Sequence, residues 1–532
     1  MYGTSIAGRR IAGAVGTGVL FALAVPDVGA WPLAFVAWVP LLLAIEGASV
    51  RHALALGWIA GCVMIFPTFV WLTEVLGRFA GLPPVAAYGV HLLFTVANGL
   101  QWGLFAAGVA GLRGRASPLV VAPLVWAATE ALFPQLFPWY AALAVSSRPE
   151  LLQLAELGGV TLVAAPILAF NAACAEVVLI TRLRGALRGG GAPLPQALAV
   201  LLLVGVGLPT YGVWRMAAAD ALATAAPTAR IGVVQGNHGI REWSSRETRG
   251  DVLARIQAES AIVDAQGVDF LLWGENVYPY RKALAHTGGR DAALWEPQRI
   301  RVGFDAPLVF GVVTAEPATD GPLPSMNPYG WNSAVVLAPD GVVGDVYDKN
   351  HPLPFGEYAP LVDPAWYLAN VKGASHVNPG TAVTVLRVGE WRLGPLICYE
   401  DILPRFARTV ANQGVHAFVN LTSDTWFGRS AEPAEHLGLA VLRAVEHRRA
   451  LVRSVNTGPS VYVDPAGRIV QRTELTDPDA EGPAAPVSFV ATVPMIDPAY
   501  RTPYARFGEW FPTLVVCGVV GLALRGRRPR TA

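Results

Sequence analysis

The sequence is poor in charged residues. Only 15% of its 532 residues are Asp, Glu, Lys or Arg, whereas 53% are apolar; an ordinary soluble domain has about 25% charged residues. This composition excludes an ordinary soluble protein, and the content of 16 Trp and 20 Phe excludes a disordered chain. The net charge of +1 gives no reason to expect binding to nucleic acid through its phosphates.

Cysteines and ligand motifs are also scarce. Four cysteines in 532 residues exclude a disulfide framework. The nine histidines show no HxxxH or Cys/His spacing, so we predict no metal site and interpret His351 and His436 as polar groups. No Walker A or Rossmann glycine pattern stands where a nucleotide would need it, so we expect no cofactor.

Long apolar segments are abundant, and most of them precede residue 215. A helix of about 20 apolar residues crosses a bilayer. Seven such segments lie before residue 215 and one lies near the C-terminus, so we predict about eight transmembrane helices. Their ranges are 10–25, 31–47, 53–76, 84–111, 117–133, 159–181, 194–214 and 510–524.

The arginines predict how these helices are oriented. If the N-terminus is cytoplasmic, arginines concentrate in the cytoplasmic loops, and the short loops on the other side hold only Arg78 and Arg148. By the positive-inside rule, residues 215–509 then lie outside the cytoplasm and both termini lie inside. Alternatively, residues 1–30 are a secretory signal, whose removal would leave an odd number of helices and break this alternation.

The near-zero net charge is the sum of two opposite parts. Residues 1–214 and the tail after 524 together carry 14 arginines and 7 acidic residues. The remaining segment carries 26 basic and 32 acidic residues. The sequence therefore predicts a basic inner face and an acidic outer domain.

Between residues 228 and 497 the pattern changes to short apolar runs bounded by turn residues. Six runs are predicted as buried strands, and helical patterns lie between some of them. The strands are 229–235, 268–273, 308–314, 333–337, 392–397 and 416–420, and the helices are 248–265, 404–413 and 433–449. We therefore predict an α/β domain with helices covering a sheet. The predicted domains are 1–214 (transmembrane), 228–497 (α/β), 510–524 (a further membrane helix) and 525–532 (a cytoplasmic basic tail).

Cys398 is the candidate nucleophile. The other three cysteines fall inside predicted membrane helices, where a thiol usually serves as a small packing residue. Cys398 ends a predicted strand, and the polar residues Tyr399, Glu400 and Asp401 follow it. An unpaired cysteine at this place is either inert in the core or a reactive thiol.

Lysine is rarer than cysteine, with three lysines among 40 Lys and Arg residues. The chain uses arginine at nearly every basic position, so a lysine indicates a site that needs a compact ammonium group. Lys349 lies in a segment dense in rings, prolines and hydrogen-bonding groups. Lys282 and Lys372 lie in ordinary polar stretches, and we expect them to be solvated.

Glu275 supplies a third group, because its carboxylate ends another apolar run. A thiol needs a base to take its proton, and a nearby ammonium lowers the pKa of the thiol and stabilises an oxyanion. Glu275, Lys349 and Cys398 fill these roles if the fold brings the three strand ends together.

The order of Glu275, Lys349 and Cys398 in an α/β domain resembles the nitrilase superfamily of carbon–nitrogen hydrolases. The whole chain, with its membrane helices, resembles the apolipoprotein N-acyltransferase family. The resemblance rests on segments 347–358 and 397–400, supported by 234–237, 137–139 and 420–428. The chain departs from the family at Gly274 and Asn276, which flank Glu275, at Ser423, where Asn is usual, and at Pro352-Leu353.

The resemblance implies a four-layer αββα sandwich and a two-step acyl transfer. A membrane phospholipid would donate an acyl chain to Cys398, and the N-terminal amine of a diacylglyceryl-modified apolipoprotein would take it from the thioester. Glu275 would act as general base, and Lys349 with a backbone N–H would hold the oxyanion.

Four further residues receive supporting roles from the same resemblance. Glu357 and Glu400 would orient Lys349 or the attacking amine, and Trp243 and Tyr399 would line the path of the acyl chain. The alternative for all four is structural support.

The resemblance also implies a bacterial inner-membrane protein whose catalytic domain is periplasmic, and we expect a monomer. Aromatic residues in the predicted loops near the motifs either enter the bilayer interface or belong to the core of the sandwich. They are Trp331, Trp366, Tyr367, Trp426 and Phe427.

Two other functions remain open from the sequence. A membrane-tethered amidohydrolase with the same three residues would release free fatty acid or ammonia. A transporter whose outer domain only binds ligand would keep its function after Cys398→Ala.

Overall fold

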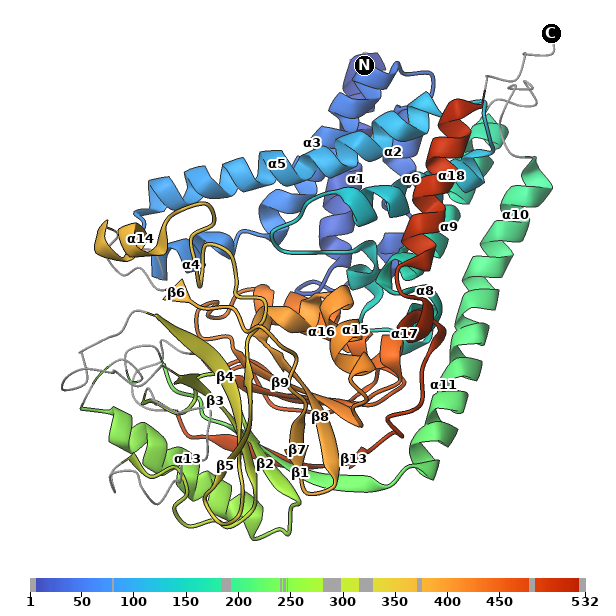
Figure 1. Ribbon diagram of the computed structural model, residues 1–532. Coiled ribbons are helices and arrows are strands. Elements are labelled where there is room, and N and C mark those ends of the chain that lie inside the picture. The colour runs from blue at the N-terminus through green and yellow to red at the C-terminus, as the bar shows by residue number, and fades with distance from the viewer. Residues whose placement is uncertain are drawn as a thin grey trace.

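Apolar helices form one end of the molecule and two stacked β-sheets form the other (Figure 1). The structure is a computed structural model. It describes residues 6–78, 81–182, 193–239, 242, 245, 247–280, 298–314, 329–370, 376–477 and 484–525.

Five described helical segments are long and apolar enough to cross a membrane. They are α1 (Ile6–Ala24), α3 (Val50–Thr68), α5 (Pro84–Gly111), α9 (Val160–Arg182) and the continuous α10 to α11 (Leu194–Ala225). Three shorter apolar segments are η1 with α2 (Trp31–Ala44), α6 (Pro118–Leu132) and α18 (Trp510–Leu524). These helices occupy the predicted apolar segments, and the number that cross a bilayer stays a prediction.

Two of the predicted segments are each divided between two helices, and a third is longer than predicted. The segment 31–47 holds η1 (Trp31–Phe35) and α2 (Val39–Ala44), and the segment 53–76 covers most of α3 and of a separate helix, α4 (Leu72–Arg78). The last segment before the sandwich does not end at residue 214. Its helix continues to Ala225, because the alanine-rich end favours helix without being strongly apolar.

The two sheets are built from thirteen described strands. In the first sheet the order is β13-β1-β2-β3-β4-β5, with β6 paired to β4, and in the second it is β12-β11-β10-β9-β8-β7. The strands are β1 (Thr228–Gln235), β2 (Phe270–Trp273), β3 (Leu308–Thr314), β4 (Tyr329–Leu337), β5 (Val343–Asp348), β6 (His376–Val377), β7 (Leu386–Val388), β8 (Trp391–Ile397), β9 (Ala417–Ser423), β10 (Leu451–Asn456), β11 (Val461–Val463), β12 (Ile469–Arg472) and β13 (Val487–Pro494).

Helices cover both outer faces of this sandwich. Helix α13 (Arg249–Asp264) packs on β1, β2 and β13 of the first sheet. Helices α15 (Pro404–Asn412) and α16 (Glu432–His447) cover the second sheet on the side that faces the membrane helices (Figure 1). The four layers confirm the expected αββα fold.

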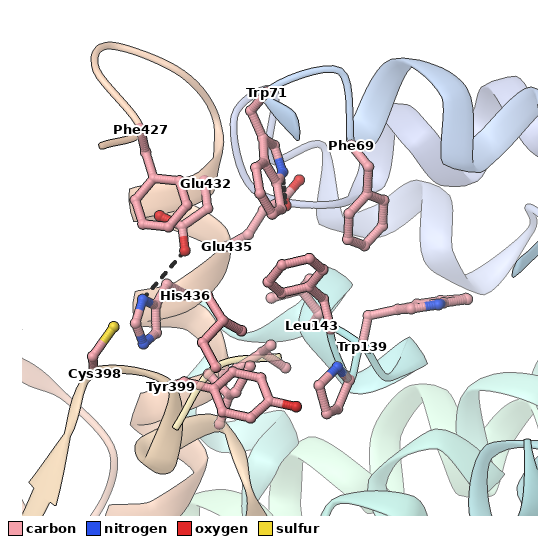
Figure 2. A pocket seen from close by; sticks show the side chains of 15 residues that line it. Phe69, Trp71, Trp139, Leu143, Cys398, Tyr399, Phe427, Glu432, Glu435 and His436 are labelled. Carbon is pink, nitrogen blue, oxygen red and sulfur yellow. Dashed lines mark hydrogen bonds and ion pairs between the residues drawn. The ribbon is translucent and has the colours of Figure 1, made fainter. Parts of the chain in front are cut away.

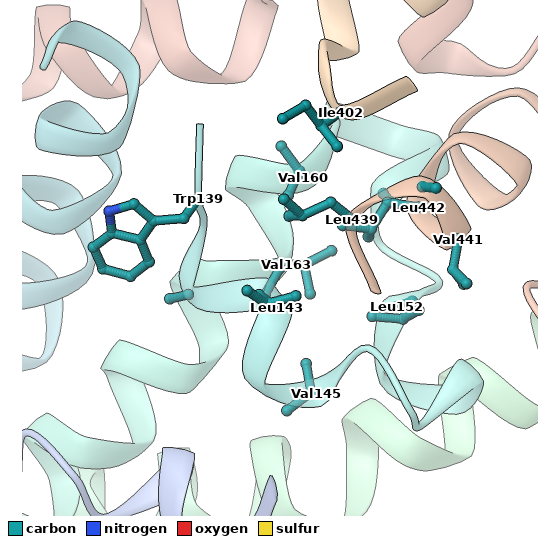
Figure 3. Packing of buried hydrophobic residues seen from close by; sticks show 14 of the residues in the cluster. Trp139, Leu143, Val145, Leu152, Val160, Val163, Ile402, Leu439, Val441 and Leu442 are labelled. Carbon is teal, nitrogen blue, oxygen red and sulfur yellow. The ribbon is translucent and has the colours of Figure 1, made fainter. Parts of the chain in front are cut away.

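One hydrophobic cluster joins the apolar helices to the second sheet. In Figure 3, Leu143 and Val163 from the helical end lie beside Leu439 and Leu442 of α16, and all four are buried. Burial of apolar surface contributes roughly 25 cal/mol per Å² to stability, so this contact fixes α16 between the two halves. A separate cluster packs α13 on the first sheet.

Charged residues add to the contact between the halves. Glu156 lies in the short helix α8 (Ala155–Gly158). Its carboxylate forms ion pairs with Arg215 of α11 at 2.5 Å and with Arg448 at 2.7 Å. Glu156 and Arg448 are each 1% exposed. Farther along α11, Asp220 pairs with Arg468 at 2.6 Å on the surface.

Candidate active site

The three residues predicted from strand ends converge at one edge of the sandwich. Glu275 follows β2 and Lys349 follows β5 in the first sheet, whereas Cys398 follows β8 in the second. The Lys349 Nζ lies 3.6 Å from the Glu275 Oε1, and both side chains are buried. Cys398 lies close enough to both for their charges to act on its thiol.

The main chain is strained at two of these strand ends. Cys398 has φ +49° and Asn276, directly after Glu275, has φ +50°. Side chains other than glycine rarely adopt this left-handed region, and each such residue costs about 1–3 kcal/mol. The positive φ at Cys398 marks a sharp turn of the chain directly after β8.

Glycine before Glu275 has a local reason. A Cβ at Gly274 would stand 3.1 Å from the carbonyl oxygen of Thr422 and 3.2 Å from that of Ser454, both in the second sheet. The main chains of the two sheets therefore approach closely at this point. Gly311 of β3 lies against the other side, where a Cβ would stand 2.6 Å from the backbone N of Asn276.

Asn332 of β4 is a part of the site that the sequence did not indicate. Its Nδ2 donates to the Glu275 Oε1 at 2.6 Å and to the Glu357 Oε1 at 3.1 Å. The Glu357 Oε2 lies 2.7 Å from the Lys349 Nζ and accepts from the backbone N–H of Leu353 at 2.6 Å. Glu357 therefore contacts Lys349, and Asn332 bridges the two carboxylates.

The second oxygen of Glu275 is bound by the second sheet. The backbone N–H of Ser423, at the end of β9, donates to the Glu275 Oε2 at 3.0 Å. Because the donor belongs to the main chain, a serine in place of the family's usual asparagine keeps this contact.

Glu400 anchors the main chain around the site. Its carboxylate accepts from the Tyr347 hydroxyl at 2.7 Å and from the backbone N–H groups of Asn350, His351 and Ile397 at 2.7, 3.0 and 2.8 Å. These donors flank Lys349 on both sides and include the residue before Cys398. Glu400 therefore positions Lys349 through the main chain.

Tyr399 lies in the wall of a cavity that Cys398 also lines. Its hydroxyl donates to the carbonyl oxygen of Leu136 at 2.7 Å, in the loop after α6. Trp243, the other residue expected on the acyl path, lies outside the described residues, as do Lys282 and Lys372.

The predicted interfacial aromatic residues divide between both alternatives. Trp366 on α14 (Pro364–Asn370) is 57% exposed, whereas Phe427 is 7% exposed and lines the Cys398 cavity. Tyr367 and Trp426 are partly buried. Trp331, which we expected in a loop, belongs to β4, because this strand begins four residues before the predicted start.

Burial and charge together set the protonation of the site. Burial raises the pKa of Cys398 well above its ordinary value, Glu275 raises it further, and Lys349 opposes both. Burial also raises the pKa of Glu275 against the effect of Lys349. Burial lowers the pKa of Lys349, but Glu357 and Glu275 outweigh it, so this pKa lies above its ordinary value. The resting site therefore holds a neutral thiol, a cationic lysine and a carboxyl with raised proton affinity.

A cavity lies at Cys398 and is lined by residues from both halves of the molecule. Figure 2 shows its walls: Cys398 and Tyr399 on one side, α16 on another, and Phe69, Trp71 and Trp139 from the helical end. The thiol therefore opens into a mainly aromatic chamber to which both halves of the molecule contribute.

Buried ion pairs lie behind the α16 wall. His436 Nε2 lies 2.7 Å from the Asp401 Oδ1, and Arg453 Nη1 lies 2.7 Å from the Asp401 Oδ2. The potential metal-ligand atoms of Asp424, Glu432 and His436 lie within 4.8 Å of one another, a spacing that could hold a metal ion. Arg453 Nη2 already lies 3.7 Å from the Asp424 Oδ1, so an ion pair occupies the Asp424 side of this group. The absence of a metal site stays a prediction.

Comparisons with known proteins cover both parts of the chain. Residues 17–173 match the family described as Apolipoprotein N-acyltransferase N-terminal domain, and residues 230–482 match the family described as Carbon-nitrogen hydrolase. An amidase from Nesterenkonia sp. of known structure is 20% identical with a TM-score of 0.35, covering 52% of this chain and 95% of the amidase.

Relatives extend over most of the chain. The apolipoprotein N-acyltransferase of Geobacter metallireducens is 33% identical over 476 residues, which cover 87% of this chain and 86% of the relative. That of Pseudomonas putida is 30% identical, with 98% and 97% covered, and that of Bdellovibrio bacteriovorus is 27% identical, with 97% and 94% covered. The chain therefore belongs to the apolipoprotein N-acyltransferase family.

Proposed function

We propose that this protein transfers a fatty acyl chain from a membrane phospholipid to the N-terminal amine of the diacylglyceryl-cysteine of apolipoproteins. The observation that carries the proposal is the placement of Cys398. Its thiol lies close enough to Glu275 and Lys349 for their charges to act on it, and it lines a cavity rich in aromatic residues to which the apolar helices contribute. The relatives' name supports the acceptor, and the apolar helices support a lipid donor.

In the first step, the Cys398 Sγ attacks the ester carbonyl carbon of the phospholipid while Glu275 takes the thiol proton. The tetrahedral oxyanion is held by the Lys349 ammonium and by a backbone N–H after Cys398. The intermediate then breaks the bond to the glycerol oxygen. That oxygen takes the proton from Glu275, so lysophospholipid leaves and a thioester remains on Cys398.

In the second step, the acceptor amine attacks the thioester carbonyl. Glu275 takes a proton from the amine nitrogen, and the same two groups hold the oxyanion. The carbon–sulfur bond then breaks, and the thiolate recovers a proton from Glu275. The products are the N-acylated lipoprotein and free Cys398, as in ping-pong kinetics.

The cavity favours transfer to an amine over transfer to water. Most of its lining is aromatic or aliphatic, so an acyl chain bound there would displace water, whereas an amidohydrolase needs water at the thioester. A transporter would have no use for a strained cysteine beside a buried lysine and glutamate.

We further propose a monomer in the bacterial inner membrane, with both termini in the cytoplasm and the sandwich in the periplasm. The arginine asymmetry supports this orientation. Both substrates carry lipid chains, so a site that opens near the outer surface of the bilayer would receive both.

The thioester provides the test. Wild-type protein incubated with phospholipid labelled in its acyl chain should acquire label that hydroxylamine releases. Addition of a diacylglyceryl lipopeptide should move the label to the peptide as a third acyl chain, detected by mass spectrometry.

The matched variants are Cys398→Ser and Cys517→Ser. Cys517 is exposed on α18, so its loss should leave labelling unchanged, whereas Cys398→Ser should carry no hydroxylamine-labile label. Labile label on Cys398→Ser, or release of free fatty acid without peptide acylation in the wild type, would contradict the proposal.

A further inference from the structure

Two carboxylates interrupt the aromatic wall of the Cys398 cavity. Glu432 and Glu435 belong to the first turn of α16, and both line the cavity (Figure 2). They are 8% and 5% exposed, so both are almost completely buried. Carboxylates are rarely buried without a partner, and the acyl transfer described above uses neither of them.

Each carboxylate has one oxygen without a hydrogen-bond partner among the described residues. Glu435 accepts from the Trp71 Nε1 at 3.2 Å through its Oε2, and its Oε1 is unpaired. The Glu432 Oε1 lies 3.3 Å from the His436 Nδ1, and its Oε2 is unpaired. A buried acceptor without a donor costs about 1–3 kcal/mol, and more when it is charged. A ligand that donates hydrogen bonds would remove this cost.

Acidic groups outnumber basic groups around the two carboxylates. Asp401 and Asp424 lie behind them, which gives four acidic groups with Glu432 and Glu435. The ion pairs that reach these groups come from Arg453 and His436. Burial raises the pKa of Glu435 well above its ordinary value and that of Asp424 to about 7, so these two groups give up their protons only reluctantly. A cationic ligand beside the unpaired oxygens would stabilise their ionised forms.

The aromatic residues around Glu435 select the type of cation. The Trp71 ring packs edge-to-face against Phe427 at 5.5 Å and against Phe137 at 5.2 Å. Aromatic faces together with carboxylates bind organic ammonium groups, through cation–π attraction and charge-assisted hydrogen bonds.

We propose that Glu432, Glu435 and Trp71 form a binding subsite for an organic ammonium group inside the Cys398 cavity. This inference rests on the proposed function, which brings two such groups to the cavity. One is the headgroup ammonium of an aminophospholipid donor, and the other is the α-ammonium of the acceptor before it loses its proton. The two half-reactions separate these sources.

The donor arm measures formation of the Cys398 thioester without acceptor. The donors are phosphatidylethanolamine and phosphatidylglycerol with identical acyl chains. If the subsite binds the headgroup, wild-type kcat/KM should be about tenfold higher for phosphatidylethanolamine, since a charge-assisted hydrogen bond of about 1.4 kcal/mol gives this factor. The Glu432→Gln/Glu435→Gln protein should lose the preference.

The acceptor arm measures transfer from a preformed thioester to a diacylglyceryl lipopeptide. If the subsite binds the α-ammonium, the donor preference should be absent. The double variant should then raise the KM for the lipopeptide about tenfold while thioester formation stays unchanged. Either pattern supports an ammonium subsite, and each identifies a different source.

Gln is nearly isosteric with Glu and keeps an oxygen for the Trp71 N–H, so the double variant should fold. Thermal melting checks this, and the single Glu435→Gln protein repeats both arms if melting falls. Glu390→Gln, at an exposed turn between β7 and β8, is the matched control and should behave as wild type.

Two results would overturn the inference in different ways. If wild type forms the thioester but the double variant changes neither the donor preference nor the acceptor KM, the subsite does not exist and the proposed function stands. If wild type forms no thioester from either donor, the proposed function fails and the subsite fails with it.

Discussion

The side-chain amide of Asn332 links the two carboxylates that surround Lys349. Asn332 donates to Glu275 and to Glu357, and Lys349 contacts both carboxylates from the other side. A donor to an ionised carboxylate favours the ionised form, so Asn332 opposes the rise in the pKa of Glu275 that burial causes. Asn332 therefore keeps the general base available.

The pH dependence of thioester formation should reveal this role. Glu275 accepts a proton only when ionised, so kcat/KM should rise with pH through the pKa of Glu275, which lies above the ordinary value of a carboxyl. Asn332→Ala removes a donor and should move this acid limb to higher pH, with a loss of about 10- to 100-fold at neutral pH. A variant whose rate falls equally at every pH would show a merely structural role for Asn332.

Residue chemistry explains why the sequence indicated some members of the site and not others. Lys349 stands out because arginine fills nearly every other basic position, and Cys398 because the other cysteines lie in apolar segments. Asn332 carries no such signal, since asparagine is common and its partners are distant in the chain. Glu432 and Glu435 look like ordinary first-turn acids of a helix, and only the fold shows that they are buried.

Among the elements, β3 limits the position of Glu275, because β3 packs directly against the chain that leaves β2. Gly311 lies in β3 directly beside the chain that leaves β2, and a Cβ there would press on the backbone of Asn276 and Glu275. Gly344 in β5 of the same sheet has its nearest neighbours, atoms of Val336, at 3.7 Å. A substitution at Gly344 is therefore a suitable control for the same substitution at Gly311.

Gly311→Ala should displace Glu275, lower the free energy of unfolding by about 1–3 kcal/mol and abolish most acyl transfer. Gly344→Ala should leave both nearly unchanged, because ordinary van der Waals space exists there. Melting temperature and thioester formation of the two proteins provide the comparison. Equal effects would show that the close approach at Gly311 does not hold the site.

The extents of elements were predictable where burial is uniform. β3 has the predicted bounds Leu308–Thr314, because a run that is almost wholly buried reads as one apolar stretch. β4 begins before its predicted start, since Gly330 and the polar Asn332 interrupt the apolar pattern. Helix α11 continues past the predicted apolar run, because helix propensity does not depend on hydropathy.

For the whole molecule, the attachment of α11 to the rest depends on a buried acid more than on surface charge. Glu156 holds Arg215 and the buried Arg448, whereas Asp220 pairs with Arg468 in solvent. Glu156→Gln leaves a buried guanidinium without its carboxylate and should cost about 3–5 kcal/mol. Asp220→Asn should cost less than about 1 kcal/mol.

Thermal unfolding of both variants in the same detergent checks this difference. Destabilisation of similar size would mean that water reaches Glu156 and screens its ion pairs. Loss of acyl transfer in Glu156→Gln at temperatures where the protein is still folded would instead show that the attachment also sets the geometry of the cavity.

The two-part architecture was predictable from the sequence because hydropathy and arginine distribution are averages over many residues. How the parts fit together was not, because that contact depends on single side chains such as Leu143 and Leu439. The cavity could not be foreseen for the same reason, since its walls come from segments more than 300 residues apart, such as Trp71 and Phe427.

The shared cavity has a consequence for engineering. Glu275, Lys349 and Cys398 all belong to the sandwich, yet much of the chamber around the thiol is supplied by a half that contains none of them. A sandwich expressed alone would expose the apolar face of α16 and leave its cysteine open to solvent. The fate of the acyl group therefore depends on both halves, and the transferase cannot be divided into an anchor and an independent enzyme.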